Sequence, residues 1–156
     1  EGIRRAIEAG VDSIEHGYYM TTDLLEMMLS QGIAWVPTVA PIGNCVKYPS
    51  ERHTEQEKEN LARILEGHLT HIYKGHQMGV LIGIGTDAGA FQVPHGASFA
   101  DEIMWVHSAG ISLKEVYRLA TEGNAQICGL KRHGKIEIGS PLERLQLIPA
   151  DYLQRL

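Results

Sequence analysis

The chain has 156 residues, 44% hydrophobic and 21% charged, and a formal net charge of −5. This composition is ordinary for a soluble globular protein, no run approaches the ~18 apolar residues of a membrane span, and no basic cluster marks a nucleic-acid partner. A small-molecule partner is therefore expected. The distant Cys45 and Cys128 indicate neither a disulfide framework nor a zinc ribbon, so a reducing cytoplasmic location is expected.

The chain opens on a segment typical of a helix already in progress. Ile3 and Ile7 lie one helical turn apart and Gly10 supplies a stop, but neither an initiator Met nor a helix cap comes first. We therefore expect this sequence to be a piece of a longer polypeptide. Residues 11–16 follow as a short predicted strand.

A second helix and a second strand are predicted next. The helix covers residues 23–31 and has an apolar face. The strand covers residues 33–39, and Pro37 marks its end, where a missing backbone donor does least harm. Residues 40–50, which contain two prolines and a glycine, are predicted to form a long loop.

A long helix and a buried strand come after this loop. Thr54 and Glu57 have the spacing of a capping box, which predicts the start of a helix that runs to Met78. The apolar run at residues 80–86 is bounded by glycines. It is typical of a strand in a parallel sheet that is buried on both faces.

Two further helices are expected, over residues 98–110 and 112–128. The first begins with the capping pattern of Ser98 and Asp101, and the second with the equivalent pattern at Ser112. Strands that alternate with helices predict an α/β fold with a parallel sheet. In such folds the chemistry lies at the carboxyl ends of the strands, where candidate residues must therefore be found.

The end of the chain changes character. Residues 134–138 and 145–148 look like two short strands around a turn. We therefore expect two parts, a main body over residues 1–132 and a short β element of an accessory domain over residues 133–156.

His16 meets the positional requirement because it ends the first predicted strand. Gly17 follows it and permits a sharp turn of the backbone. Side chains alternate along a strand, so His16 shares a face with Ile14 and projects into the mouth of a barrel if that face is the interior. A hydrogen-bonded structural histidine is the alternative to a metal ligand.

Asp87 meets the same requirement at the end of the third predicted strand. Gly83 and Gly85 lie on its face of that strand and are expected to leave the space beneath the carboxylate empty. A buried carboxylate needs a cation or hydrogen-bond donors, and a metal ion would satisfy it. The alternative is an N-cap or turn aspartate, which does not require the two glycines.

Five motifs occur in the order found in one known family, and together they are far more specific than any one alone. They resemble the C-terminal half of an amidohydrolase, nearest to the prolidase-like and Xaa-Arg/Lys dipeptidase-like enzymes, with imidazolonepropionase as a more distant relative. The resemblance extends to about Gly139. The motifs are Ile14-Glu15-His16-Gly17, Val36-Pro37-Thr38, Gly85-Thr86-Asp87-Ala88-Gly89 with Val93-Pro94-His95-Gly96, Ala109-Gly110-Ile111-Ser112, and the stretch from Ala120 through Asn124 to Leu130.

The resemblance implies a partial (β/α)₈ TIM barrel, consisting of strands six to eight with their helices, plus the short C-terminal β element. By resemblance, His16 is the metal-ligand histidine of strand six, and Asp87 is the strand-eight aspartate that contacts the metal. The seventh strand, which ends near Thr38, supplies no ligand in this family.

The implied activity is hydrolysis of C–N bonds, in an amide, peptide or cyclic amide substrate, through a metal-activated water. Asp87 would accept the proton of that water and pass it to the leaving amine. Zinc is the expected ion, with one or two ions per site in the full-length parent.

Three elements of the family's site are missing from this sequence: the first-strand His-x-His pair, the bridging lysine of strand four and the histidine of strand five. Catalytic zinc usually has three or more protein ligands, so this chain alone is expected to be inactive. Near its end, Gly139-Ser140-Pro141 stands where the family has Gly-Lys-x-Ala-Asp, which leaves the register of the terminal β element open.

His95 and Tyr18 are candidates for substrate binding because they lie in the loops after the third and first strands. For each, a loop residue that only packs is the alternative. His68, His71 and His76 share one helix, which is expected to face the barrel exterior, away from the strand ends. No metal site is predicted there.

A non-catalytic half-barrel is the alternative to the enzyme. It would fold only by association with its missing half or with itself, because three barrel strands leave unpaired edges and bare apolar faces. An upstream reading frame with a His-x-His pair would favour the enzyme, and a stop codon there the alternative. A homo-oligomer is left open, and neither a nucleic acid nor a membrane is expected as a partner.

Overall fold

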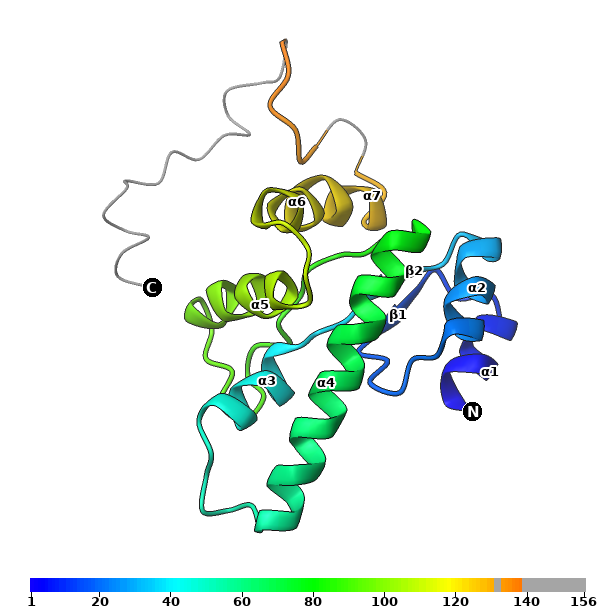
Figure 1. Cartoon of the computed structure of the whole chain (residues 1–156). Coiled ribbons are helices and arrows are strands. Elements are labelled where there is room, and N and C mark those ends of the chain that lie inside the picture. Colours follow the sequence, from blue (N-terminus) through cyan, green and yellow to red (C-terminus); the bar gives the residue numbers. More distant parts are fainter. Residues whose placement is uncertain (131–132, 139–156) are drawn as a thin grey trace.

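The computed structural model describes residues 1–130 and 133–138 (Figure 1). In this part of the chain, helices carry most of the regular structure and two short strands form a parallel sheet. The helices are α1 (Gly2–Glu8), α2 (Thr22–Gln31), α3 (Ala40–Lys47), α4 (Glu55–Met78), α5 (Ala97–Ser108), α6 (Leu113–Arg118), the π-helical turn η1 (Leu119–Gly123) and α7 (Asn124–Ile127).

The sheet keeps the order of the chain. β1 (Ser13–Glu15) pairs in parallel with β2 (Ala34–Val36). On the other side of β2, Trp35 forms a single parallel bridge with Ile82. Residues 80–86 around this bridge are called the third segment, and they follow β1 and β2 in sequence order. The predicted parallel α/β arrangement is therefore confirmed, with strands shorter than expected.

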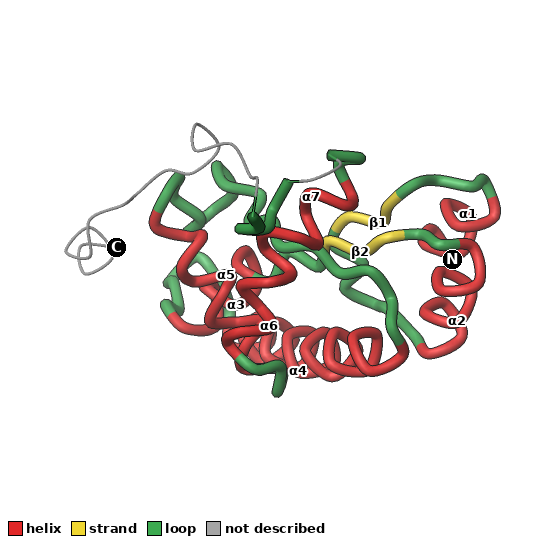
Figure 2. The backbone as a smooth tube through the Cα atoms, turned by 90° about the horizontal axis from the view of Figure 1, so that it is seen from above, coloured by secondary structure: helices red, strands yellow, loops and turns green. Residues whose placement is uncertain are grey.

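The helices form one continuous series of contacts that runs from α1 to α6. α1 contacts α2, α2 contacts α4, α4 contacts α3 and α5, and α5 contacts α6. Figure 2 shows α1 and α2 beside one end of the strands, α3, α5 and α6 gathered at the other, and α4 running between the two groups. The long helix therefore connects both halves of the structure.

The start and end of α4 follow from the local sequence. The Thr54 hydroxyl accepts a hydrogen bond from the Glu57 backbone N–H (3.3 Å), and the Glu57 carboxylate accepts one from the Thr54 N–H (2.8 Å). This is the predicted capping box. Gly79 ends the helix with a φ of 88°, a conformation that glycine adopts at little cost.

Residues 40–50 do not form the predicted loop, because most of them fold as α3. Pro41 lies in the first helical turn, where a proline sacrifices no hydrogen bond. The cap comes from α5, whose Glu102 carboxylate accepts hydrogen bonds from the backbone N–H groups of Val39 (2.9 Å) and Ala40 (2.6 Å). A cap supplied from so far along the chain leaves no local signal in the sequence.

The packing of α3 against α5 also requires the glycine at position 43. A β-carbon at Gly43 would lie 2.4 Å from the indole of Trp105, so only glycine lets the two helices approach this closely. The Trp105 indole N–H donates to the Asn44 side chain at 3.0 Å. Gly43 is therefore a packing residue and not a loop residue.

Residues 80–86 form a single bridge and not the predicted strand. The Trp35 N–H donates to Leu81 (2.8 Å), and the Gly83 N–H donates to Trp35 (2.9 Å). Beyond Gly83 the described residues form no further ladder hydrogen bond with β2, since the next donor in line would be Pro37, which has no N–H. The hydrophobic run predicted burial correctly, since Ile82 and Ile84 belong to the core, but burial alone does not create a ladder.

A side chain takes the place of a neighbouring strand beside this segment. The Asn124 amide oxygen accepts from the Ile84 N–H (2.8 Å), and its NH₂ group donates to the Ile84 carbonyl (2.9 Å). Both polar backbone groups of Ile84 are thus satisfied without a strand partner.

The predicted helix over residues 112–128 is continuous but contains a π-helical turn. Its Ser112 cap is confirmed, with the hydroxyl accepting from the Glu115 N–H at 3.3 Å. Gly123, at the end of η1, lies so close to Ile82 that a β-carbon would be 2.7 Å from the carbonyl oxygen. The helix therefore meets the third segment backbone to backbone.

The predicted cap at the start of α5 is wrong. Gly96 is the N-cap. Within the described part of the chain, the Ser98 hydroxyl is buried with no hydrogen-bond partner and the first turn has no side-chain cap. Asp101 instead reaches α3, where it accepts from the Asn44 amide (3.3 Å) and pairs with Lys47 (3.4 Å). Packing between α3 and α5 has displaced the local pattern.

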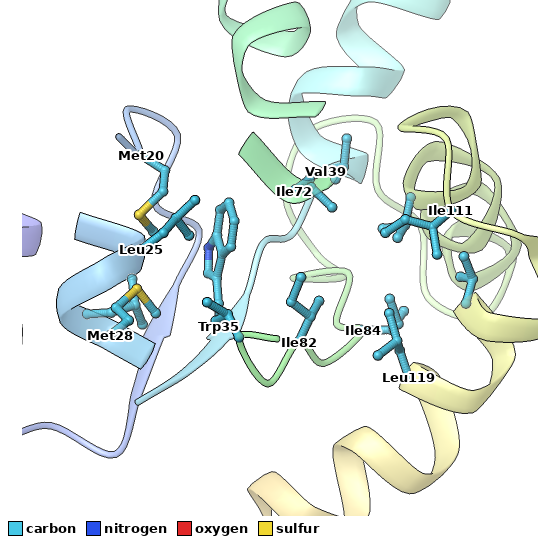
Figure 3. Close-up of a cluster of buried hydrophobic side chains, with 14 of the residues drawn as sticks. Met20, Leu25, Met28, Trp35, Val39, Ile72, Ile82, Ile84, Ile111 and Leu119 are labelled. Carbon is cyan, nitrogen blue, oxygen red and sulfur yellow. The ribbon is translucent and has the colours of Figure 1, made fainter. Parts of the chain in front are cut away.

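Trp35 lies at the centre of the core, where it is fully buried (Figure 3). Leu25 and Met28 of α2 lie on one side of it, and Ile72 of α4 and Ile82 lie on the other. The Trp35 indole N–H donates to the carbonyl of His16, directly after β1 (2.9 Å). The core therefore holds the backbone at that strand end directly.

The predicted C-terminal β element is only partly within the described residues. Residues 134–138 form no strand, so that half of the prediction is wrong. Residues 145–148 lie outside the described part, and the boundary between 132 and 133 stays a prediction. None of the described helices combines the length and apolar character needed to cross a membrane.

Candidate functional site

Three residues that follow the three parallel segments share an unusual backbone conformation. The φ angles are 63° at His16, 55° at Thr38 and 51° at Asp87, and only one other non-glycine residue of the described chain, Gln92, has a positive φ. This region costs a residue with a side chain about 1–3 kcal/mol, and such strain gathers at functional sites. The carboxyl ends of the strands therefore form the candidate site.

His16 has a fixed backbone and an unpaired ring nitrogen. Its N–H donates to Val36 of β2 (2.9 Å), and its carbonyl accepts the indole N–H of Trp35 (2.9 Å). Its Nδ1 is buried and has no hydrogen-bond partner among the residues that the structure describes. A buried polar atom left unpaired is costly, so this nitrogen is available for a ligand.

Tyr18 connects the loops that follow β1 and β2. Its hydroxyl donates to the Thr38 carbonyl (3.1 Å), and its ring centroid lies 5.8 Å from that of His16. Burial, followed by the negative charges of Glu102 and Asp87, raises the Tyr18 pKa to about 12. Tyr18 is therefore a protonated donor beside His16, within the electrostatic range of Asp87.

Asp87 is exposed in this chain, which contradicts the expectation of a buried carboxylate. The space beneath it is not empty either. A β-carbon at Gly83 would lie 2.6 Å from Ile127, and one at Gly85 would lie 2.9 Å from Val36. The two glycines thus allow close packing of the third segment on α7 and β2, and burial does not force a cation onto Asp87.

His95 lies beside the turn that follows Asp87. The Ala90 N–H donates to the Asp87 carbonyl (3.2 Å), and a β-carbon at Gly89 would lie 3.7 Å from the His95 Nε2. The His95 side chain is exposed. The structure brings it to the loop that carries Asp87, and its role in substrate binding stays a prediction.

His68 does not face the exterior as predicted. It is buried, its Nε2 lies 2.8 Å from the Pro37 carbonyl at the end of β2, and its ring contacts Tyr18 edge to face (4.9 Å). Burial lowers its pKa to about 4, so the ring is neutral, and since a carbonyl only accepts, Nε2 carries the hydrogen. His68 therefore supports the site through Pro37 and Tyr18, and its Nδ1 has no partner within residues 1–130 and 133–138.

Glu102 was not recognised from the sequence, although a signal was present. It is fully buried, and Ser98, Glu102 and Val106 recur every four residues on the buried face of α5. Burial raises the Glu102 pKa to about 7, against the lowering effect of the N–H groups of Val39 and Ala40. Its carboxylate therefore holds the turn next to Thr38.

The donors at the strand ends fit part of a divalent-metal site. No three His, Cys, Asp or Glu side chains converge on one point within residues 1–130 and 133–138. The unpaired imidazole nitrogen of His16 and the carboxylate of Asp87 are nonetheless the nitrogen and oxygen donors that zinc accepts. Further ligands would have to come from outside the described residues.

Comparison with known families gives one match over most of the chain. The model of the Amidohydrolase family covers residues 1–141. The matched region includes both strands, the third segment and every helix described above.

Individual relatives agree with this match. An uncharacterized protein of Mycobacterium tuberculosis is 32% identical over 116 residues, which are 70% of this chain and 29% of that protein. The crystal structure of ochratoxinase from Aspergillus niger superimposes with a TM-score of 0.74 at 26% identity, over 88% of this chain and 31% of that one. A Xaa-Pro dipeptidase with methionine bound in its active site gives a TM-score of 0.71 at 29% identity, over 87% of this chain and 34% of that one. The chain thus spans about a third of the length of the proteins it resembles.

Proposed function

Because this chain belongs to the amidohydrolase family, we propose that it carries one part of the active site of a metal-dependent hydrolase that cleaves amide or peptide C–N bonds. The remaining part lies in the two thirds of the relatives' length that this chain does not span.

The fold supports a position late in a TIM barrel. β1, β2 and the segment around Ile82 are parallel and adjacent in sequence order, as successive barrel strands are. In this proposal they are strands six, seven and eight. Their carboxyl ends carry His16, Thr38 and Asp87, and in barrel enzymes that end of the barrel is the catalytic one.

His16 and Asp87 are the residues that would hold the ion. Nδ1 of His16 is buried and without a partner, and the exposed carboxylate of Asp87 is accessible to an ion, water or substrate. A divalent ion bound there supplies Lewis acidity, which lowers the pKa of a water to about 7 and polarises the scissile carbonyl. Zinc fits these donors best.

Asp87 has the second role of moving a proton. Its carboxylate accepts the proton of the attacking water and gives it to the leaving amine, which needs a mobile, solvent-accessible acid and base. Tyr18, whose pKa is about 12, keeps its hydroxyl proton throughout. It orients the loop after β1 through its bond to Thr38 and does not itself transfer protons.

One observation carries the proposal: the unpaired, buried Nδ1 of His16 at a strand end. The structural histidine His68 uses one ring nitrogen in a hydrogen bond to the Pro37 carbonyl, whereas the His16 ring makes no hydrogen bond within the described residues. Together with the family match, the free nitrogen favours a metal ligand over a packing residue.

The test uses the intact protein, meaning the complete natural protein that carries this chain. Its metal content is measured, and hydrolysis is assayed on dipeptides, N-acyl amino acids and cyclic amides. We expect bound divalent metal and a hydrolysis activity that a chelator removes and zinc restores. We further expect His16→Ala to lose metal. Full activity after complete chelation would overturn the proposal.

A further inference from the structure

The loop that follows Asp87 is folded back on itself. The Gly89 N–H donates to the Val93 carbonyl (2.9 Å), and the Val93 N–H donates in turn to the Ala90 carbonyl (3.0 Å). The Ala90 N–H donates to the carbonyl of Asp87 (3.2 Å), and the Val93 side chain is buried. Residues 87–93, the Asp87 loop, therefore form one hydrogen-bonded unit, in which a displacement at one residue is passed on to Asp87.

Asn44 of α3 anchors the Asp87 loop. Its side chain is buried, and its Nδ2 donates to the Gln92 carbonyl at 2.9 Å. Its Oδ1 accepts the indole N–H of Trp105 at 3.0 Å. Because an amide carries its donors and its acceptor on separate atoms, one side chain connects the loop to both α3 and α5. The Glu102 cap fixes the start of α3, so Asn44 is a firm anchor.

The segment after α3 holds the Asp87 loop a second time. The Gln92 Nε2 donates to the Tyr48 carbonyl at 2.8 Å. The neighbouring Phe91 has the guanidinium of Arg52 over its ring, 5.0 Å from the centroid. Two adjacent residues of the Asp87 loop are thus bound to the connection between β2 and α4.

Gln92 is held in a conformation that costs free energy. Its φ is 60°, a region that a residue with a side chain rarely adopts. Its Oε1 is buried and has no hydrogen-bond partner in the part of the chain that the structure describes. Both features are unfavourable, and such costs persist where the surrounding contacts impose a position that function requires. The contacts of Gln92 therefore indicate a role in the site beyond packing.

The exposed side chain of Asp87 depends on this support. An exposed carboxylate has few contacts of its own, so its direction is set by the backbone that carries it. We propose that Asn44 and Gln92 are positioning residues, which hold the Asp87 loop so that the Asp87 carboxylate faces the attacking water and the leaving amine. This inference rests on the proposed function, because it gives the two residues a task in the proton transfer by Asp87. Both act through the loop, and neither transfers a proton.

The first test removes the anchor in the intact protein. Asn44→Ala is assayed on the best substrate of the panel with saturating zinc, so that the fraction of metal-loaded protein stays constant. We expect kcat to fall about 10-fold or more, because a displaced base loses the geometry of proton transfer, while KM changes less than about 2-fold. Ile7→Val, which removes a methyl group from the buried core at α1, is the control. It should lower the melting temperature and leave kcat unchanged.

The second test uses a half-buried residue, whose truncation does not endanger folding. Gln92→Ala removes the contact with the Tyr48 carbonyl and keeps the backbone carbonyl that Asn44 binds. We expect kcat to fall about 3-fold or more at unchanged KM. The double variant should lose little beyond Asn44→Ala alone, because both contacts hold the same loop. Gln31→Ala, at an exposed glutamine of α2, is the matched control and should behave as the wild type.

Hydrogen exchange at the amides of Gly89 and Val93 measures the loop independently of the reaction. Asn44→Ala and Gln92→Ala should each accelerate this exchange about 10-fold or more, since the loop opens locally, and Ile7→Val should not. If Asn44→Ala fails to fold, the exchange and the kcat of Gln92→Ala decide.

The outcomes separate the positioning role from the proposed function. Unchanged exchange in both variants, or faster exchange with unchanged kcat, would overturn the positioning role and retain the proposed function. Faster exchange in an intact protein that binds no metal and hydrolyses no amide would overturn the proposed function and leave the hold of Asn44 and Gln92 on the loop in place.

Discussion

The buried carboxylate of Glu102 in α5 accepts a hydrogen bond from the backbone N–H of Ala40 at 2.6 Å. It also accepts one from Val39, directly after Thr38, whose carbonyl accepts the Tyr18 hydroxyl. The contact therefore fixes the turn after β2 and, through Thr38, the tyrosine beside His16. A single buried side chain thus supports the backbone of the candidate site.

Glu102 should make stability depend on pH. Its pKa is about 7 in the folded chain and ordinarily near 4.5, so the folded state binds the proton more tightly. The free energy of unfolding therefore falls as the pH rises from 4.5 through 7. The shift corresponds to roughly 3 kcal/mol. Urea unfolding of the intact protein and of Glu102→Gln should show this decline in the wild type alone. An equal pH dependence in both proteins would contradict the assignment.

His68 should act in the opposite direction at lower pH. Its pKa of about 4 lies below the ordinary 6.5, so the unfolded state binds the proton more tightly. Stability is full above pH 6.5 and is lost as the pH falls toward 4, by roughly 3 kcal/mol. His68→Gln keeps a donor for the Pro37 carbonyl but does not titrate. Its unfolding free energy should change less over this range, and parallel pH curves for the two proteins would disprove the prediction.

Asn124→Ala should destabilise the third segment. The substitution removes both hydrogen bonds to the backbone of Ile84, whose side chain is buried. We expect a loss of about 2 kcal/mol, since the two backbone groups are left without partners. Chemical denaturation measures the loss, and hydrogen exchange at the Ile84 amide should accelerate. Gln77→Ala, at an exposed amide side chain of α4, is the control and should change little.

Gly123→Ala and Gly67→Ala should change stability in opposite directions. A β-carbon at position 123 would lie 2.7 Å from the Ile82 backbone oxygen, so η1 and the third segment must move apart. That shift should cost about 2 kcal/mol or more, as overpacking of a core does. At position 67 the methyl group meets no atom, and the better helix former should add about 0.5–1 kcal/mol. Melting temperatures of the two variants distinguish the cases, and a matching sign would contradict the packing analysis.

Asp87→Asn should abolish turnover and leave the fold intact. The amide keeps the shape of the carboxylate but cannot accept a proton, so kcat should fall by about 10²-fold or more. The side chain is exposed, so the melting temperature should stay close to that of the wild type. Activity on the best substrate of the panel and circular dichroism provide the measurements. Retained activity would remove Asp87 from the proposed mechanism.

Local patterns predicted the elements whose causes are local. The capping box at Thr54, the Ser112 cap and the stop at Gly79 all lie where the sequence places them. The alternation of strands and helices likewise predicted a parallel α/β arrangement, and the motif order predicted the family.

Features determined by distant residues were not predictable in this way. α3 exists because Glu102 caps it and Trp105 packs on Gly43, and both residues come from α5. On the edge of the third segment that faces away from β2, the Asn124 amide takes the place of a strand partner. In each case a contact across tens of residues outweighs the local pattern.

The candidate site was likewise predictable only where its features depend on local sequence. The positions of His16 and Asp87 at strand ends follow from the motifs, whereas their exposure does not, because it depends on which side chains fill the space below. His68 was assigned to the outer face, and its contact with Pro37 shows that a long helix can turn one histidine inward while its neighbours stay at the surface.

The left-handed conformation of His16, Thr38 and Asp87 constrains how this protein can be improved in the laboratory. Glycine adopts that conformation freely, so a screen for heat resistance alone should favour glycine at these positions. A screen for turnover should reject it at His16 and Asp87, where the proposed function requires the side chains. Directed evolution would therefore meet a trade-off between durability and turnover at these two positions, and stabilising changes should be sought at a distance from the strand ends.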